Sequence, residues 1–196
     1  MNNGQTKPGY NVQIATENQY IVNYDLYWRP TDYGTIIPFL QSFHDKFGFY
    51  SSEIVADSGY GSEQNYEFMF ANGMTPYVKY NLFHKEMKRK FLKNPFHKAN
   101  SYKSSAKELL TSQRGLMHRS NRPIEPEACF GNIKFNHGFK RFHLKSARKT
   151  KVEWGLVSLA HNLRKYVAYK AKLKNKQAHS MVIVLEKPAL MLNATI

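Results

Sequence analysis

The sequence predicts an α/β fold, in which strands of mixed direction form a layer with helices. Two observations carry this prediction. Between Gly9 and Trp28, apolar and polar residues alternate with the period of two that is typical of half-buried strands. From Ile36 onward, apolar residues recur at the three- and four-residue spacing of amphipathic helices, and helix-like and strand-like segments then take turns up to Tyr80.

The length and the net charge of the chain indicate one basic domain. The chain has 196 residues, which suffices for one domain with a hydrophobic core. Lysine and arginine number 29 against 14 acidic residues, so the net charge is +15. A surplus of this size indicates a polyanionic partner, either nucleic acid or an anionic membrane. We expect nucleic acid, because no basic amphipathic helix with a bulky apolar face stands out.

The expected compartment is the cytoplasm. No apolar run approaches the roughly 20 residues of a membrane span. The polar start, from Met1 to Pro8, lacks the apolar core of a signal peptide. The single cysteine, Cys129, excludes an internal disulfide and a cysteine-based zinc site within a monomer. We therefore expect no membrane partner.

The first segment, from Tyr10 to Trp28, is expected to form one antiparallel ribbon. Val12 and Ile14 alternate with polar neighbours, and the same alternation resumes at Tyr20. The three residues 17–19 between the two runs suit a tight hairpin turn.

A helix is expected next, capped at its start by Thr31 or Asp32 and closed by Gly48. Its apolar positions are Ile36, Ile37, Leu40, Phe43 and Phe47. Pro38 lies inside the pattern, so the helix is expected to begin late or to kink.

The stretch around Asp57 is the most informative in the chain. A short apolar strand over 52–57 ends at this carboxylate, and a glycine-rich turn follows it. A helix over 62–72, with Tyr66, Met69 and Phe70 directed inward, and a strand over 75–80 come next. Asp57 is then either a metal ligand at the rim of the sheet or a turn residue that binds its own loop.

Residues 81–122 change character, because cations and aromatic side chains alternate there without regular periodicity. A short helix is expected only around 105–113. The segment is either a solvated surface insertion or a loop that binds a polyanion through charge and stacking. The cations that open it are Lys85, Lys88 and Arg89.

Two helices are expected in the C-terminal third. The first covers 123–136, begins with a proline, and places Glu127 and Lys134 on one face. Without the other motifs, Glu127 is better explained as a solvated residue with no role. A basic link containing Lys140 and Arg141 follows. The second helix is expected to direct an apolar stripe toward the core, formed by Val152, Leu156, Leu159, Ala160, Leu163 and Val167.

Taken together, three of these stretches resemble the C-terminal part of bacterial insertion-sequence transposases of the DDE type, which carry an RNase H-like catalytic domain. The resemblance covers roughly residues 4–172, in order and at plausible spacing. The stretches are residues 8–18, residues 55–65, and residues 122–142 with a continuation through Glu153 to 159–165.

The resemblance assigns roles to individual residues. Asp57 matches the second catalytic Asp and Glu127 the catalytic Glu, so both are expected to hold Mg²⁺ or Mn²⁺ for two-metal phosphodiester chemistry. Arg122 and Lys134 match an Arg-Glu-Lys signature whose cations contact DNA phosphates, although the gap from Arg122 to Glu127 is one residue longer than in some members. The full set of expected DNA-binding residues is Arg122, Lys134, Lys85, Lys88, Arg89, Lys140 and Arg141.

The resemblance also implies an organisation. Residues 1–173 would form a partial RNase H-like domain, with an insertion over 81–122 and a tail over 174–196. The family carries its first catalytic Asp on a strand that should precede Gly9, and no Asp stands there. We therefore expect an N-terminally truncated transposase that cleaves DNA poorly or not at all by itself.

The expected partners are transposon-end DNA and a second copy or a full-length transposase, with the protein on the nucleoid when bound. Two other functions stay open. One is a non-catalytic nucleic-acid-binding protein, such as a domesticated or inhibitory transposase fragment. The other is a nuclease of the same fold, which would need a further carboxylate near Asp57.

Overall fold

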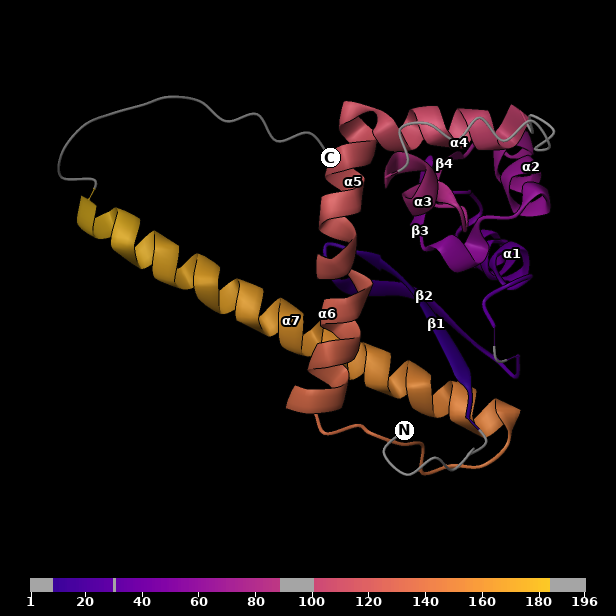
Figure 1. Ribbon diagram of the computed structural model, residues 1–196. Coiled ribbons are helices and arrows are strands. Elements are labelled where there is room, and N and C mark those ends of the chain that lie inside the picture. Colours follow the sequence, from indigo (N-terminus) through magenta and orange to yellow (C-terminus); the bar gives the residue numbers. More distant parts are fainter. Residues whose placement is uncertain (1–8, 30, 89–100, 184–196) are drawn as a thin grey trace.

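The computed structural model describes residues 9–29, 31–88 and 101–183, with backbone alone for residues 88 and 175–183. Helices surround two small sheets, so the predicted mixed α/β class is confirmed (Figure 1). The described strands do not form the single sheet expected, because they pair only two by two. The antiparallel pair is β1 (Asn11–Glu17) with β2 (Tyr20–Tyr27), and the parallel pair is β3 (Glu53–Ala56) with β4 (Thr75–Val78).

The predicted hairpin is confirmed. The turn between β1 and β2 consists of Asn18 and Gln19, whose φ angles are 50° and 61°. Two successive residues with positive φ form the type of turn whose twist matches a two-stranded ribbon. The register shifts once, between Ala15 and Thr16.

The parallel pair is covered by two of the predicted helices, α1 (Ile36–Phe47) and α2 (Glu63–Ala71). Leu40, Tyr66 and Met69 pack with Val78 of β4 in one buried cluster. Ser62 caps α2, because its hydroxyl accepts a hydrogen bond from the Asn65 amide.

Two details predicted for these helices are wrong. The N-cap of α1 is Thr35 instead of Thr31 or Asp32, and its hydroxyl is occupied by Gln13 Nε2 rather than by the helix. Phe70 is 37% exposed instead of buried, since its ring stacks on Tyr102 at the surface.

The insertion is more helical than its sequence indicates. It contains α3 (Phe83–Lys88), α4 (Ser101–Thr111) and α5 (Gln113–Asn121). Gly115 permits the tight junction of α4 and α5, because a β-carbon there would lie 2.1 Å from the carbonyl oxygen of Leu109. The sequence shows little helical periodicity here, because α4 and α5 bury only Ala106, Leu110 and Gly115.

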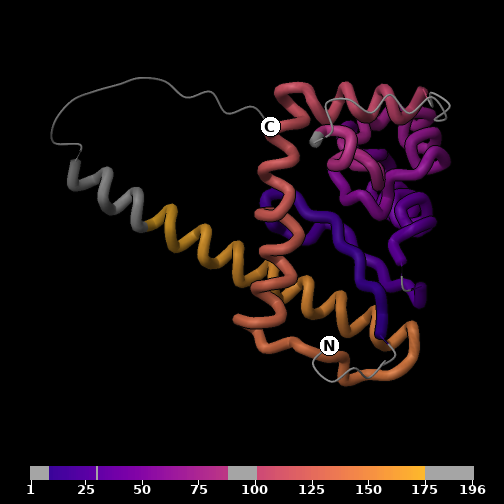
Figure 2. Tube along the Cα trace, in the orientation of Figure 1, coloured from indigo at the N-terminus to yellow at the C-terminus, as the bar shows by residue number. Residues whose placement is uncertain are grey.

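The predicted helix over 123–136 consists of three consecutive turns of different type. They are the 3₁₀ turn η2 (Arg122–Ile124), α6 (Pro126–Gly131) and the π-helical turn η3 (Asn132–Asn136). A loop then leads to α7 (Ala147–Ile183), which projects past the rest of the described chain (Figure 2). Within the described residues, no helix is both long and apolar enough to cross a membrane.

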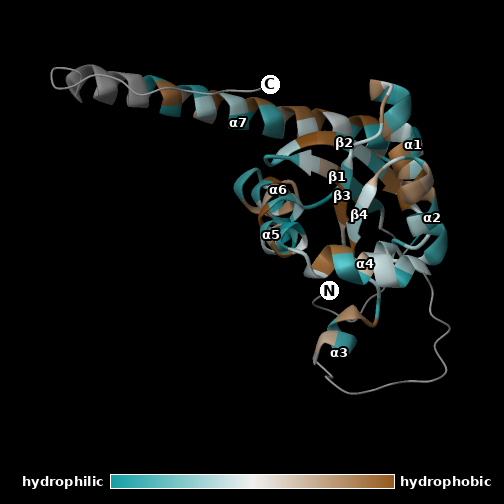
Figure 3. Ribbon diagram, turned by 90° about the horizontal axis from the view of Figure 1, so that it is seen from above, coloured by the Kyte–Doolittle hydropathy of each residue, from teal (hydrophilic) through white to brown (hydrophobic). Residues whose placement is uncertain are grey.

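The orientation predicted for α7 is wrong. Its apolar stripe points outward, with Leu156 63% exposed and Leu163 55% exposed. The face that packs along β2 carries Trp154 and His161, which are both about 3% exposed. Figure 3 shows α7 running beside β2. Polar anchoring decides this orientation, because the Asn162 side chain accepts from the Ile21 amide and donates to the Ile21 carbonyl, both at 2.9 Å.

The orientation of α7 can be tested by two truncations on opposite faces. Trp154→Ala should lower the free energy of unfolding by about 3–5 kcal/mol, because it empties a buried site. Leu159→Ala should cost less than about 1 kcal/mol, because Leu159 is 54% exposed. Denaturant titration followed by circular dichroism measures both, and a larger loss for Leu159→Ala would refute the observed orientation.

Candidate active site

Asp57 lies directly after β3 and at the N-cap position of the short 3₁₀ turn η1 (Ser58–Tyr60). Its side chain is 49% exposed. The loop that follows is fixed against the end of β4, because a β-carbon on Gly61 would lie 2.1 Å from the carbonyl oxygen of Lys79. The strand and this glycine together hold the carboxylate at the surface.

Glu127 lies in the first turn of α6, immediately after Pro126. Its side chain is 61% exposed. A proline at the first helical position costs no hydrogen bond, and the positive end of the helix dipole favours a carboxylate in this turn.

Arg122 joins the two carboxylates. One guanidinium nitrogen, Nη2, lies 3.3 Å from Asp57 Oδ2, and the other, Nη1, lies 3.5 Å from Glu127 Oε1. The Arg122 side chain is only 21% exposed, so it is held in this position. The structure thus brings together three of the residues that the sequence singled out.

A fourth group near this cluster is Asp32. A β-carbon on Gly59 would lie 3.3 Å from the Asp32 β-carbon, so Asp32 packs on the loop that follows Asp57. Its carboxylate accepts hydrogen bonds from Asn11 Nδ2 at 2.8 Å and from Gln13 Nε2 at 3.4 Å. Asp32 therefore ties β1 to the Asp57 loop.

The same region raises the pKa of the Tyr60 hydroxyl. Burial is the main cause, and the nearby carboxylates of Asp32 and Asp57 add to it, whereas Arg122 opposes it. The phenol therefore stays protonated and lies within the electrostatic field of both acids.

The donor chemistry at this cluster fits a hard divalent cation. Asp57 and Glu127 offer carboxylate oxygens, and the atoms Asp57 Oδ1 and Glu127 Oε2 are not the ones that contact Arg122. Mg²⁺ commonly binds through one or two carboxylates and keeps several waters. In the described part of the chain, no group of three or more His, Cys, Asp and Glu side chains is arranged to hold a metal ion.

The other predicted DNA-binding residues are spread over the surface. Lys85 is exposed on α3, which ends at Lys88, and Arg89 lies outside the described residues. Lys134 is exposed within η3, with its ammonium 5.5 Å from the Phe130 ring centre. Because η3 is π-helical, the regular spacing expected between Glu127 and Lys134 does not hold.

Lys140 and Arg141 are exposed in the loop before α7. Glu153 holds this loop, since its carboxylate accepts the backbone amides of His143 and Leu144 at 2.9 Å each. Burial acts to raise the pKa of Glu153, but these hydrogen bonds outweigh it and lower the pKa.

Gln19, at the tip of the hairpin, was not singled out from the sequence. Its amide donates to Glu125 Oε2 at 2.7 Å, and its carbonyl accepts from Cys129 Sγ and His161 Nε2. Burial raises the pKa of the Cys129 thiol to about 11, so it stays protonated as a donor. The sequence predicts the turn that contains Asn18 and Gln19, but no neighbouring residue indicates which helices Gln19 contacts.

The start of β3 anchors the helix that leads to Arg122. Glu53 accepts from Arg114 Nη2 at 3.0 Å and contacts His118 Nε2 at 3.1 Å, and both partners lie on α5. The hydrogen bond from Arg114 is the largest cause that lowers the pKa of Glu53. This contact holds α5 along β3, which carries Asp57 at its other end.

The acidic pair of Asp57 and Glu127, linked by Arg122, thus lies at the surface of a strongly basic chain. Residues 82–167 match the family model described as Transposase DDE domain. This segment of the chain is therefore similar to the transposases of the DDE type. The matched segment includes Arg122, Glu127 and Lys134, whereas Asp57 precedes it. Neither the curated proteins nor the solved structures gave a match.

The anchor at Glu53 has a testable pH dependence. Its pKa is lowered in the folded state, so its stabilisation is present above the unfolded pKa of about 4.3 and is lost as the pH falls through the folded value. Glu53→Gln should cost about 1 kcal/mol at neutral pH. The loss should shrink below about pH 4 in denaturant titrations.

Glu67→Gln is the matched control, because Glu67 is exposed on α2. If Glu53→Gln and Glu67→Gln behave alike at every pH, the anchor contributes nothing.

Proposed function

We propose that this chain supplies part of the centre of a metal-dependent DNA transposase, with Asp57 and Glu127 as its catalytic carboxylates. The observation that carries the proposal is the contact of both carboxylates with the one guanidinium of Arg122. The two acids are far apart in sequence, and a shared cation would have no reason to join them if each only served its own loop.

The chemistry follows from these residue types. When bound, Mg²⁺ or Mn²⁺ polarises the phosphodiester and activates the attacking water or 3′-hydroxyl. Asp57 and Glu127 would hold the ion through their oxygens. Arg122 neutralises the acidic pair, and its guanidinium would also bind a DNA phosphate placed beside the two carboxylates.

The topology supports an RNase H-like arrangement for residues 1–173, with the insertion over 81–122. Within the described chain, β1 pairs only with β2, and β3 only with β4, so each of these strands keeps one unpaired edge. In Figure 3 the two pairs are arranged in succession, with β1 and β3 as the inner members. A further strand between them would complete one mixed sheet and could bring a third carboxylate close to Asp57.

DNA is the proposed substrate, bound through the exposed cations Lys85, Lys134, Lys140 and Arg141, with Lys88 and Arg89 beside them in the sequence. Two described carboxylates make a sparse metal site. We therefore propose that the chain binds DNA but needs a further acidic residue, from a second copy or a full-length transposase, for cleavage.

Cleavage assays test the catalytic part. Incubation of the purified chain with duplex DNA and Mg²⁺ or Mn²⁺ should give no more product than the Asp57→Asn variant gives. Robust metal-dependent cleavage that is lost in both Asp57→Asn and Glu127→Gln would disprove catalytic incompleteness.

Binding assays test the DNA part and separate it from catalysis. Charge reversal at Lys85 or at Lys140 should weaken the binding of DNA duplexes of unrelated sequence to about the same extent, because phosphate contacts carry no sequence information. Either change should also make the affinity for DNA less dependent on the salt concentration. Fluorescence anisotropy with labelled duplexes measures this.

The alternative is a non-catalytic DNA-binding or inhibitory fragment. It predicts that Asp57→Ala and Glu127→Ala change neither DNA binding nor any effect on a full-length transposase. If the two carboxylates are catalytic, both variants should instead lose Mn²⁺ binding and any cleavage that appears when the chain is mixed with full-length enzyme.

A further inference from the structure

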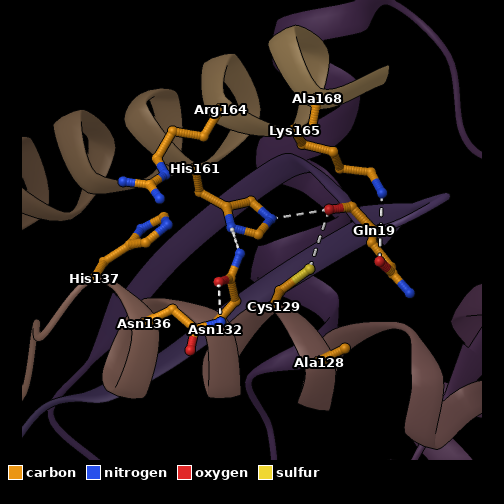
Figure 4. Close-up of a pocket in the computed structure, with 10 residues that line it drawn as sticks. All are labelled: Gln19, Ala128, Cys129, Asn132, Asn136, His137, His161, Arg164, Lys165 and Ala168. Carbon is orange, nitrogen blue, oxygen red and sulfur yellow. Dashed lines mark hydrogen bonds between the residues drawn. The ribbon is translucent and has the colours of Figure 1, made fainter. Parts of the chain in front are cut away.

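A pocket of about 490 Å³ lies between the α6–η3 segment and α7, beside the tip of the β1–β2 hairpin (Figure 4). The polar side chains that face it come from both helical segments. They include Asn132, Asn136, His137, His161, Arg164 and Lys165.

The lining of this pocket is positively charged without a counter-ion. No Asp or Glu is among the residues that line it. Arg164 is exposed and takes part in no salt bridge or hydrogen bond within the described residues. Lys165 contacts only neutral groups there, namely Gln19 Oε1 at 3.3 Å and the Tyr20 ring at 5.2 Å. Both cations thus keep their full capacity to bind an anion.

The two histidines of this pocket differ in their hydrogen bonds. His161 is fixed, because Nε2 lies 3.0 Å from the Gln19 carbonyl and Nδ1 lies 3.3 Å from Asn132 Nδ2. A carbonyl only accepts, so Nε2 carries the proton and Nδ1 accepts from the amide. The His137 ring lies 6.1 Å from the His161 ring and beside the Arg164 guanidinium (Figure 4).

Burial, Arg164 and His161 all lower the pKa of His137. In the absence of an anion His137 is therefore neutral, and its ring offers one N–H donor. A bound anion would offset the repulsion from Arg164.

The position of this pocket relative to Glu127 indicates which kind of anion it binds. The segment that carries Glu127 in its first turn also forms a wall of the pocket at Asn132. At 1.5 Å rise per residue, these two positions are separated by roughly 8 Å along the helix. Since each nucleotide advances a DNA strand by about 3.4 Å, a strand whose phosphodiester lies at Glu127 has further phosphates at about this distance.

We propose that this pocket binds a backbone phosphate of the DNA strand, with Arg164 and His137 as its donors and Lys165 as a second positive charge. The inference rests on the proposed function, because it takes the same DNA as its ligand. It adds a contact that positions the strand a few nucleotides from the acidic pair.

The test compares two single-charge removals on α7. Arg164→Gln should weaken the binding of a fluorescein-labelled duplex by about 5- to 10-fold and lower the slope of log affinity against log salt by about one. Arg164→Lys should retain most of the affinity. Lys170→Gln is the control, because the Lys170 ammonium lies 5.6 Å from the Tyr166 ring and does not line the pocket; its affinity should stay within about twofold of the unaltered chain.

A second readout locates the ligand. Addition of unlabelled duplex should shift the imidazole signals of His137 in NMR spectra of the full chain, and Arg164→Gln should abolish this shift.

The outcomes separate the two claims. Equal binding by Arg164→Gln and Lys170→Gln overturns the pocket but leaves the proposed function standing. Failure of the unaltered chain to bind DNA overturns both. A His137 shift with inorganic phosphate but not with duplex overturns DNA as the ligand of the pocket.

Discussion

The backbone of Gln19, at the tip of the β-hairpin, is the contact on which the site depends. The turn leaves the amide and carbonyl of this residue free of the strand ladder, and buried backbone groups of this kind must find partners. Both backbone groups have partners on helices. The amide of Gln19 donates to Glu125, and its carbonyl accepts from the Cys129 thiol and the His161 ring. The side chain adds bonds to Ile124 and Lys165. One residue thereby fixes α6, which carries Glu127, and α7 against the same ribbon.

The second half of the site is fixed independently. β3 ends at Asp57, and Glu53 at its other end holds α5 through Arg114 and His118. Because α5 runs directly into Arg122, that anchor also directs the guanidinium toward Asp57. The carboxylates are thus held by two separate sets of contacts, one on the hairpin and one on the parallel pair, and Arg122 is the group that connects them.

Local signals in the sequence predicted the elements that local chemistry determines. The hairpin, α1, the β3–Asp57 segment and α2 each have their own periodicity, glycine or capping serine. The sequence could not predict which face of α7 packs. Its apolar stripe includes Leu156 and Leu163, yet the polar clamp of Asn162 on Ile21 turns Trp154 inward. Likewise, nothing near Arg122 indicates that it reaches Asp57, because that contact depends on the packing of the insertion. The roles of these residues in catalysis stay predictions, supported by the match of residues 82–167 to the Transposase DDE domain.

The claim that Asp57 and Glu127 form one site is tested most directly by chemical cross-linking. Asp57→Cys and Glu127→Cys would be combined in a chain whose native thiol is removed by Cys129→Ala, and treated with a short bis-maleimide before peptide mass spectrometry. The positive control is Glu86→Cys with Lys107→Cys in the same background, since these side chains approach to 4.0 Å. We expect an intramolecular link between positions 57 and 127 that forms as efficiently as the link in the control. A chain that links 86 to 107 but never 57 to 127 would contradict it.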